Sequence, residues 1–258
     1  MKIASLGSSF AAGPGIKPIV DRSAMRSGQN YANVVAQRLQ ADLTDLSVSG
    51  ATLLTIWNEE QVFFGKTFEP QLQGLPEDVD AVFILGGGND IQYVGGMITD
   101  SIESYWLGRM TLWISSKLFQ SSSNPAAIPD EETLSTRYGD VLDAIHAKAP
   151  KAKVIVLEYL TMLGPDATPG VDVPFGTMCV KKYEDVASAL QRATSKAVSG
   201  RGWCQRVPVA ELSKQHGIGS SEPWVWGFSL GTIMAGALYH PNEAGMRAVA
   251  DMILRALN

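Results

Sequence analysis

The sequence is poor in charged residues and in the residues that bind metals. Of its 258 residues, 18% are charged, and only two cysteines and three histidines are present. The cysteines, Cys179 and Cys204, form neither a CxxC pair nor another spacing typical of metal ligands. The cysteines therefore do not indicate a metal site. Two free thiols are one interpretation of the cysteines, and a single disulfide is the other.

Long apolar runs and runs of one charge are missing as well. The longest apolar stretches have about the length of a strand, which argues against a membrane-spanning helix. The net charge of -5 and the lack of a Lys/Arg run argue against a nucleic-acid partner. The first residues, Met1–Leu6, resemble a strand and not a signal peptide. The chain is therefore expected to be cytoplasmic, unless it starts at a mature N-terminus.

The sequence does contain an alternation of short apolar runs and helical patterns, which is typical of a parallel sheet covered by helices. Runs such as Val82-Phe83-Ile84-Leu85 are continuous, as expected of strands buried on both faces. The predicted fold is a single domain, 1–258, of the three-layer α/β/α class with a five-stranded, mainly parallel sheet. The predicted strands are Lys2–Leu6, Asp45–Ser47, Ala81–Leu85, Lys153–Leu157 and Arg206–Ala210, and the predicted helices are Asn30–Gln40, Ser135–Lys148, Tyr183–Val198 and Glu243–Leu257.

Two stretches stand outside this alternation. Asn58–Pro76 is aromatic and is predicted to be a loop. Gln92–Asp130 is longer and contains an apolar helical pattern with Trp106 and Trp113. A long excursion of this kind is often a lid or a wall of a binding site. A peripheral helix packed on the core is the alternative interpretation.

Polar and glycine-rich blocks follow three of the predicted strands. Gly7-Ser8-Ser9-Phe10 comes after the first strand, Ser49-Gly50-Ala51-Thr52 after the second, and Gly87-Gly88-Asn89-Asp90 after the third. The carboxyl ends of parallel strands are where open α/β sheets bind ligands. No GxxxxGK[ST] motif is present and no GxGxxG motif follows a strand, so the glycines do not indicate a nucleotide site.

One histidine stands out from the other two. His146 lies near the end of a predicted helix, and His216 lies in a predicted surface loop. His240 is followed by Pro241 and by Asn242, a good N-cap for the last helix. His240 is therefore held at the boundary of an element, where a catalytic base can be fixed.

These four blocks, in this order, resemble those of the SGNH (GDSL-like) hydrolases over nearly the whole chain. The resemblance implies a flavodoxin-like sheet and an esterase or lipase that needs no cofactor. It implies that Ser9 is the nucleophile, that His240 is its base, and that an acyl-enzyme forms. It also implies an oxyanion hole made by the backbone N–H groups of Ser9 and Gly50 and the side-chain amide of Asn89.

The chain departs from the family pattern at two positions. Ser8 stands where the family usually has an aspartate before the nucleophile, and Ala237 stands where it usually has the aspartate that orients the histidine. No Asp or Glu occurs between Glu222 and His240. A Ser–His dyad is therefore expected, with His240 Nδ1 bonded to a backbone carbonyl at or near Ala237.

A second serine motif competes with the first. Gly227-Phe228-Ser229-Leu230-Gly231 matches the nucleophile elbow of α/β-hydrolases. Only the 29 residues from Leu230 to Asn258 follow Ser229, which leaves no room for the further strands of that fold. The motif is therefore interpreted as a loop, with nearby aromatic residues packing at the mouth of the site.

The resemblance leaves the substrate and the final acceptor open. A small-molecule or lipid ester is the expected partner, and Trp106, Trp113 and Trp226 are the expected substrate contacts. An acyltransferase with the same site and an inactive binding protein with the same fold are the alternatives. The sequence offers no evidence on the oligomeric state.

Overall fold

The computed structural model describes residues 1–105 and 128–257. A five-stranded sheet lies at its centre, with all neighbouring strands parallel and in the order β4-β1-β7-β8-β9. The fold is therefore α/β with the predicted sheet. The strands are β1 (Lys2–Gly7), β4 (Asp42–Asp45), β7 (Ala81–Leu85), β8 (Lys153–Leu157) and β9 (Cys204–Val207).

The three central strands carry the core. All five residues of β7 are buried, and Ile84 pairs with Leu6 of β1 and with Val156 of β8. Burying an aliphatic side chain of this size contributes about 1.5–3 kcal/mol, so the apolar runs strongly favour the centre of the sheet. The continuous runs therefore predicted both the strands and their two-sided burial correctly.

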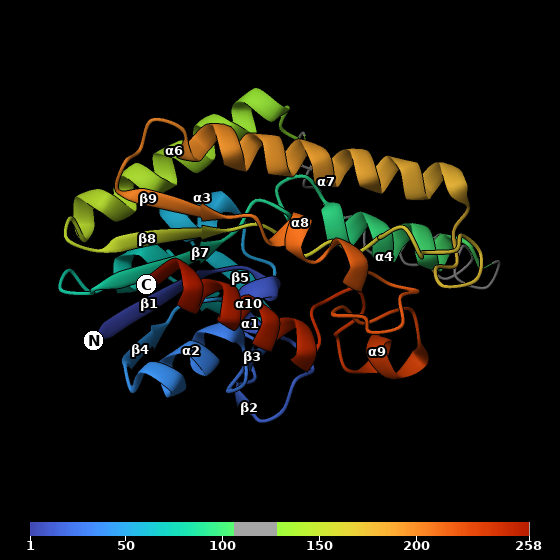
Figure 1. The fold of residues 1–258 in the computed structure, drawn as a ribbon, viewed down its shortest axis with the longest axis horizontal. Helices are drawn as coiled ribbons and strands as arrows, with labels where there is room; N and C mark the ends of the chain where they lie inside the picture. Colours follow the sequence, from blue (N-terminus) through green and yellow to red (C-terminus); the bar gives the residue numbers. More distant parts are fainter. Residues whose placement is uncertain (106–127, 258) are drawn as a thin grey trace.

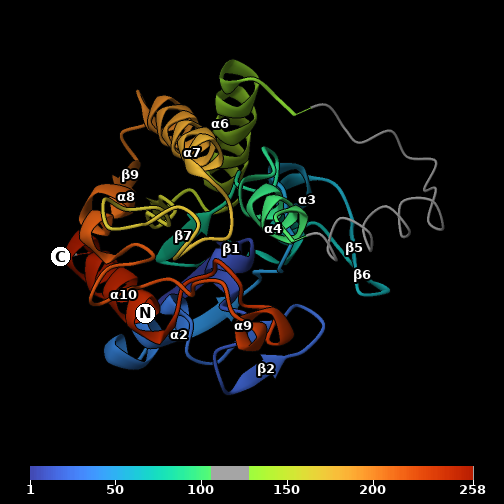
Figure 2. The ribbon, with the colours of Figure 1, turned by 90° about the vertical axis from the view of Figure 1, so that its right-hand side faces the viewer.

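Helices cover both faces of the sheet, which confirms the three layers (Figure 1). On one face lie α2 (Tyr31–Leu39) and α10 (Glu243–Leu257), which pack against each other. On the other face lie α3 (Leu53–Trp57), α6 (Glu131–Lys148) and α7 (Thr177–Val198). The carboxyl ends of the strands point to the side of the molecule that faces the viewer in Figure 2.

Several predicted boundaries are wrong by a few residues because local hydrogen bonds end or start the elements. The second strand ends at Asp45, whose carboxylate accepts from the backbone N–H of Ser47 at 3.1 Å and so turns the chain. α6 starts at Glu131 and not at Ser135, because the Asp130 side chain caps it by accepting from Thr133 N at 2.8 Å. β9 and α7 also begin earlier than predicted.

Short elements escaped the sequence analysis. The stretch predicted as a loop, Asn58–Pro76, contains a hairpin of β5 (Gln61–Phe63) and β6 (Lys66–Phe68) and the 3-10 helix η1 (Gln71–Gly74). Too few residues lie in each to show a period. The other short elements are α1 (Ser9–Ala12), β2 (Ile19–Asp21), β3 (Arg26–Ser27), α8 (Val209–Leu212), η2 (Lys214–His216) and α9 (Leu230–Met234), and the longer helix α4 (Tyr93–Glu103) follows β7.

The excursion after the third strand begins as a packed helix. α4 buries Tyr93, Val94, Met97 and Ser101 against the rest of the domain, and Ser101 Oγ is 2.6 Å from the Tyr239 hydroxyl. The predicted lid residues Trp106 and Trp113 lie outside the described residues. The part of the excursion that is described is therefore a helix that borders the segment carrying His240.

Cys179 and Cys204 are both free thiols, which agrees with the first of the two interpretations. Within residues 1–105 and 128–257, no helix has the length and apolar character needed to cross a membrane.

Candidate active site

The chain turns sharply between β1 and the helical turn that begins at Ser9. Gly7 has a φ of 152°, and a Cβ at this position would lie 2.4 Å from the carbonyl oxygen of Leu85 on the neighbouring strand. Glycine allows this close approach, and Ser8 N donates to the same carbonyl at 3.1 Å. The turn places Ser9, 7% exposed, at the carboxyl edge of the sheet.

A tyrosine that the sequence analysis did not identify supports this turn. Tyr159 follows β8, and its hydroxyl lies 2.9 Å from Ser8 Oγ and accepts from Gly88 N at 3.2 Å. Burial raises the pKa of Tyr159 to about 12, so the hydroxyl keeps its proton. Tyr159 thereby links the first and third glycine blocks through the residue that replaces the usual aspartate. Its position two residues beyond a buried strand was the available signal.

The third block holds the second block in place. Asn89 Nδ2 donates to the carbonyl of Ala51 at 2.8 Å, and the Asp90 carboxylate accepts from Leu53 N at 2.9 Å. Arg137 of α6 donates to the other Asp90 oxygen at 2.9 Å. Burial raises the pKa of Asp90, while the Leu53 N–H and the Arg137 guanidinium oppose that shift. Side chains of the third block therefore hold the backbone that follows Gly50 in place.

Gly50 lies at the tip of the second block with a φ of 82°. An added Cβ would be 3.3 Å from both Gln61 Nε2 and the Phe63 ring, so the hairpin packs closely on it. Gln61 also donates to the carbonyl of Ser49 at 2.7 Å. The positive φ orients the Gly50 backbone in a way that residues with a Cβ rarely adopt.

His240 is 8% exposed and is oriented by the backbone of its own segment. Its Nδ1 lies 2.8 Å from the carbonyl oxygen of Leu238, and its backbone N–H donates to Ala237 O at 3.0 Å. Tyr239 between them has a φ of 62°, a left-handed conformation that folds the ring back onto the preceding carbonyl. The prediction of a backbone oxygen from this segment is confirmed, although the acceptor is Leu238 and not Ala237.

Burial controls the protonation of His240. It lowers the pKa to about 4, and the carbonyls of Leu238 and Ala237 oppose this only in part. Among the described residues, no carboxylate is bonded to Nδ1. The imidazole is therefore neutral at pH 7 and able to accept a proton.

Packing brings the His240 segment next to the Ser9 turn. The ring of Phe10, the residue after Ser9, has its centroid 5.4 Å from that of His240 and 4.6 Å from that of Tyr159. Trp226 N donates to the carbonyl of His240 at 2.8 Å. The nucleophile turn, the two glycine blocks and the histidine thus meet at one edge of the sheet.

Trp226 is the only one of the three predicted substrate contacts within the described residues. It is half-buried, and its indole N–H is buried without a hydrogen-bond partner in the described part of the chain. Since a buried donor usually finds an acceptor, a bound ligand could supply one here. Trp106 and Trp113 lie in 106–127, which the structure does not describe.

The competing serine motif has a different role. Ser229 is exposed and caps α9, with its Oγ accepting from Thr232 N at 3.1 Å. The motif is not at the end of a strand of the central sheet, so it is not a nucleophile elbow. It is also not the plain loop that was predicted, because a capping box starts a short helix there.

Across residues 1–105 and 128–257, no group of three or more His, Cys, Asp or Glu side chains is placed to hold a metal ion.

Residues 5–248 match the profile of the GDSL-like Lipase/Acylhydrolase family. Among curated protein sequences, none matches the chain significantly.

Solved structures share the fold at low sequence identity. An extracellular lipase from Streptomyces rimosus has a TM-score of 0.74 and 21% identity, with 99% of each chain covered. A phospholipase A1 from Streptomyces albidoflavus has a TM-score of 0.72 and 20% identity, with 98% of each chain covered. A putative GDSL-like lipase from Parabacteroides merdae has a TM-score of 0.54 and 14% identity, covering 99% of this chain and 94% of that chain.

Proposed function

Because the chain belongs to the GDSL-like lipase/acylhydrolase family, we propose that it hydrolyses esters with Ser9 as nucleophile and His240 as general base. The observation that carries the proposal is the bond of 2.8 Å between His240 Nδ1 and the Leu238 carbonyl. This bond fixes the tautomer in which Nδ1 carries the proton and Nε2 is free to act as a base. The Phe10 ring, packed on His240, supports the proximity of the base to Ser9.

The proposed reaction proceeds through an acyl-enzyme. Ser9 Oγ attacks the ester carbonyl carbon while His240 Nε2 takes the hydroxyl proton. The tetrahedral intermediate then collapses, and His240 returns the proton to the leaving alcohol. A water molecule, activated by the same imidazole, attacks the acyl-Ser9 carbonyl, releases the acid and restores the serine.

Three donors are available for the oxyanion of the intermediate. In the described part of the chain, neither the Ser9 N–H nor the Gly50 N–H donates to a backbone carbonyl or to a side chain. The Asn89 amide uses one N–H on Ala51 O and has a second one left. Donors already oriented before the reaction stabilise developing charge without reorganising, which supports their assignment as an oxyanion hole.

The substrate proposed is a small-molecule or lipid ester that contacts Trp226. The backbone of Trp226 bonds to the backbone of His240, and the indole N–H of Trp226 lacks an acceptor among the described residues. A chain-length series of p-nitrophenyl esters tests both the activity and the size of the acyl group. Failure to hydrolyse every ester of the series would contradict the proposal.

The pH dependence of hydrolysis should reflect the buried histidine. Only neutral imidazole accepts the serine proton, and burial lowers the pKa of His240 to about 4. We therefore expect kcat/KM to stay level as the pH falls to about 5 and to be lost through an apparent pKa close to 4. Initial rates would be measured in samples quenched into alkali, where p-nitrophenolate absorbs.

Acid unfolding is the alternative cause of such a loss. Circular dichroism at each pH, together with recovery of the rate after return to neutral pH, separates the two causes. A midpoint near 6.5 in folded protein would show that His240 is solvated or that another group is the base.

The substitution Gly50→Ala should impair both turnover and folding. The φ of 82° is unfavourable for alanine, and the new Cβ would press on Gln61 and Phe63. We expect kcat to fall about tenfold or more because the N–H moves out of line. The free energy of unfolding should fall by about 1–2 kcal/mol because of the left-handed backbone.

Gly65→Ala is a matched control for the backbone effect. Gly65 has a φ of 76°, but its Cβ would meet no atom within 4 Å. This variant should lose a similar amount of stability and keep its kcat, as measured by urea unfolding and by ester hydrolysis. An equal loss of kcat in both variants would remove Gly50 from the oxyanion hole.

A further inference from the structure

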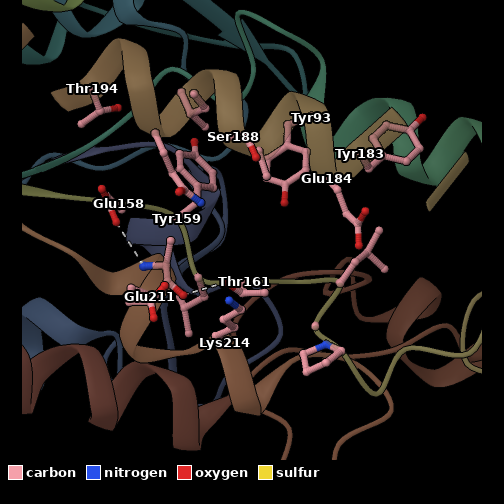
Figure 3. Close-up of a pocket in the computed structure, with 18 residues that line it drawn as sticks. Tyr93, Glu158, Tyr159, Thr161, Tyr183, Glu184, Ser188, Thr194, Glu211 and Lys214 are labelled. Atoms are coloured by element: carbon pink, nitrogen blue, oxygen red, sulfur yellow. Dashed lines mark hydrogen bonds between the residues drawn. The ribbon is translucent and has the colours of Figure 1, made fainter. Parts of the chain in front are cut away.

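A cavity lies at the same edge of the sheet as Ser9, on the far side of Tyr159 from Ser8. It is a cavity of about 390 Å³ between α7, the segment after β8 and α8 (Figure 3). The residues proposed for catalysis, Ser9, Asn89 and His240, do not line it. The wall shared with the catalytic region is Tyr159, which lines the cavity and contacts Ser8 through its hydroxyl.

The charged side chains of this cavity are mostly acidic. Glu158, Glu184 and Glu211 line it, and Lys214 is the single cationic residue of the lining. Glu158 is already neutralised, because it forms an ion pair with Arg206 and accepts from Ala210 N at 3.3 Å. Glu184 and Glu211 form no ion pair within the described residues. The free charge of the lining is therefore negative, which favours a cation over an anion.

The lysines beside Glu184 on α7 are used elsewhere. Lys181 forms an ion pair with Asp185, and Lys182 forms one with Asp100 of α4. Neither lysine lines the cavity. The carboxylate of Glu184 points into the cavity in Figure 3. The cavity thus keeps an accessible carboxylate that no neighbouring cation of α7 neutralises.

Tyr93 provides an independent sign that a ligand binds here. The residue is 2% exposed, and its hydroxyl forms no hydrogen bond with the part of the chain that the structure describes. Figure 3 shows the hydroxyl pointing into the cavity. Burial raises the pKa of Tyr93, and the charges of Tyr159 and Glu184 raise it further, so the hydroxyl stays protonated. The side chain is thus buried apart from the hydroxyl that faces the cavity, and this hydroxyl is available to a ligand that enters it.

We propose that this cavity binds an organic ammonium group, which Tyr93 and Glu184 recognise. The Glu184 carboxylate supplies the opposite charge, and the Tyr93 hydroxyl oxygen accepts from an ammonium N–H. The aromatic rings of Tyr93 and Tyr159, with centroids 6.2 Å apart and tilted by 60°, offer the surface on which organic cations are commonly held.

The position of the cavity gives the cation a place in the substrate. Resting on the proposed esterase function, the ammonium is a remote group of the ester, separated from the reacting carbonyl by the Tyr159 wall. The proposed substrate class is therefore an ester of an amino alcohol or of another ammonium-bearing compound. The binding energy of such a remote group can offset the cost of orienting the ester carbonyl at the catalytic serine.

Binding is tested without turnover in the Ser9→Ala protein. Isothermal titration would compare choline and ethanolammonium with 3,3-dimethylbutanol, a neutral compound of the same shape as choline. We expect both cations to bind about tenfold more tightly than the neutral alcohol. Equal binding of choline and its neutral counterpart would overturn the proposal.

Variants locate the site. Glu184→Gln should weaken both cations about five- to tenfold, whereas Tyr93→Phe should weaken ethanolammonium most because choline has no N–H. Asp185→Asn is the matched control, since Asp185 is the next residue of α7 and does not line the cavity. Unchanged binding in Glu184→Gln, or equal losses in it and in the control, would show that the cation binds elsewhere.

Hydrolysis separates this proposal from the esterase function. In the active protein, kcat/KM for a choline ester should exceed that for the 3,3-dimethylbutyl ester of the same acid about tenfold, and Glu184→Gln should abolish the preference. Equal hydrolysis of both esters would overturn the ammonium site and leave the esterase intact. If neither ester is hydrolysed, the esterase function is contradicted, and the binding measurement alone decides on the cavity.

Discussion

Replacement of Ser9 by alanine is expected to lower kcat for ester hydrolysis by about four to six orders of magnitude, while the protein stays folded. Without Oγ no acyl-enzyme can form, and the remaining catalysis would come only from the oxyanion donors and substrate binding. Although Ser9 is almost fully buried, the change to alanine removes a single oxygen atom, so little loss of stability is expected. Hydrolysis of p-nitrophenyl esters and thermal unfolding would be measured on the same samples.

Ser229→Ala is the matched control, since this serine also lies in a serine–glycine motif. Its hydroxyl caps α9, so the variant should lose about 1 kcal/mol of stability and retain most of its activity. A fluorophosphonate label should be found on the peptide containing Ser9 and be absent from the Ser9→Ala variant. Labelling of Ser229, or inactivation by its substitution alone, would overturn the assignment of the nucleophile.

Asn89→Ala should lower kcat by about a hundred- to a thousandfold with little change in KM. The amide N–H that is not bonded to Ala51 is free to stabilise the oxyanion, which exists in the transition state and not in the bound ester. Loss of such a donor therefore lowers kcat and leaves KM nearly unchanged. Full Michaelis–Menten curves for the wild type and the variant would separate the two constants.

The bond from Asn89 to Ala51 also supports the neighbouring loop, so a control for structural loss is needed. Asn33 of α2 donates to the carbonyl of Ser27 at 3.3 Å and to Asn30 Oδ1 at 2.9 Å, and within the described residues it makes no hydrogen bond to Ser9, Gly50, Asn89 or His240. Asn33→Ala should lower the free energy of unfolding and leave kcat unchanged. Near-normal kcat in Asn89→Ala would remove this amide from the oxyanion hole.

Local patterns in the sequence were sufficient for the core of the fold. The continuous apolar runs of β7 and β8 are typical of strands in a parallel sheet that is covered by helices on both faces. Their length and composition therefore predicted both the strands and the helical layers around them. The order of the four blocks was equally informative, because three of them follow strands that end at the same edge of the sheet and the fourth comes directly before the last helix. The assignments of Ser9, Gly50, Asn89 and His240 stay predictions, although the structure brings their segments together.

The positions of short elements depend on contacts that a sequence window does not contain. β4 ends at Asp45 because of one side-chain bond, and the hairpin of β5 and β6 is defined by its pairing and by Gln61 packed at Gly50. Neither feature has enough residues to produce a period. Their boundaries were therefore decided by tertiary packing.

The sequence by itself determined that His240 has no local carboxylate, because no Asp or Glu occurs between Glu222 and His240. It did not determine which carbonyl replaces the carboxylate. The left-handed Tyr239, held by Ser101 of α4 and by Trp226, selects Leu238. In the same way, only folding places Tyr159 beside Ser8 and points Tyr93 and Glu184 into one cavity, because these residues come from separate elements. Residues that are distant in the sequence can form one site only after the fold has packed their elements together.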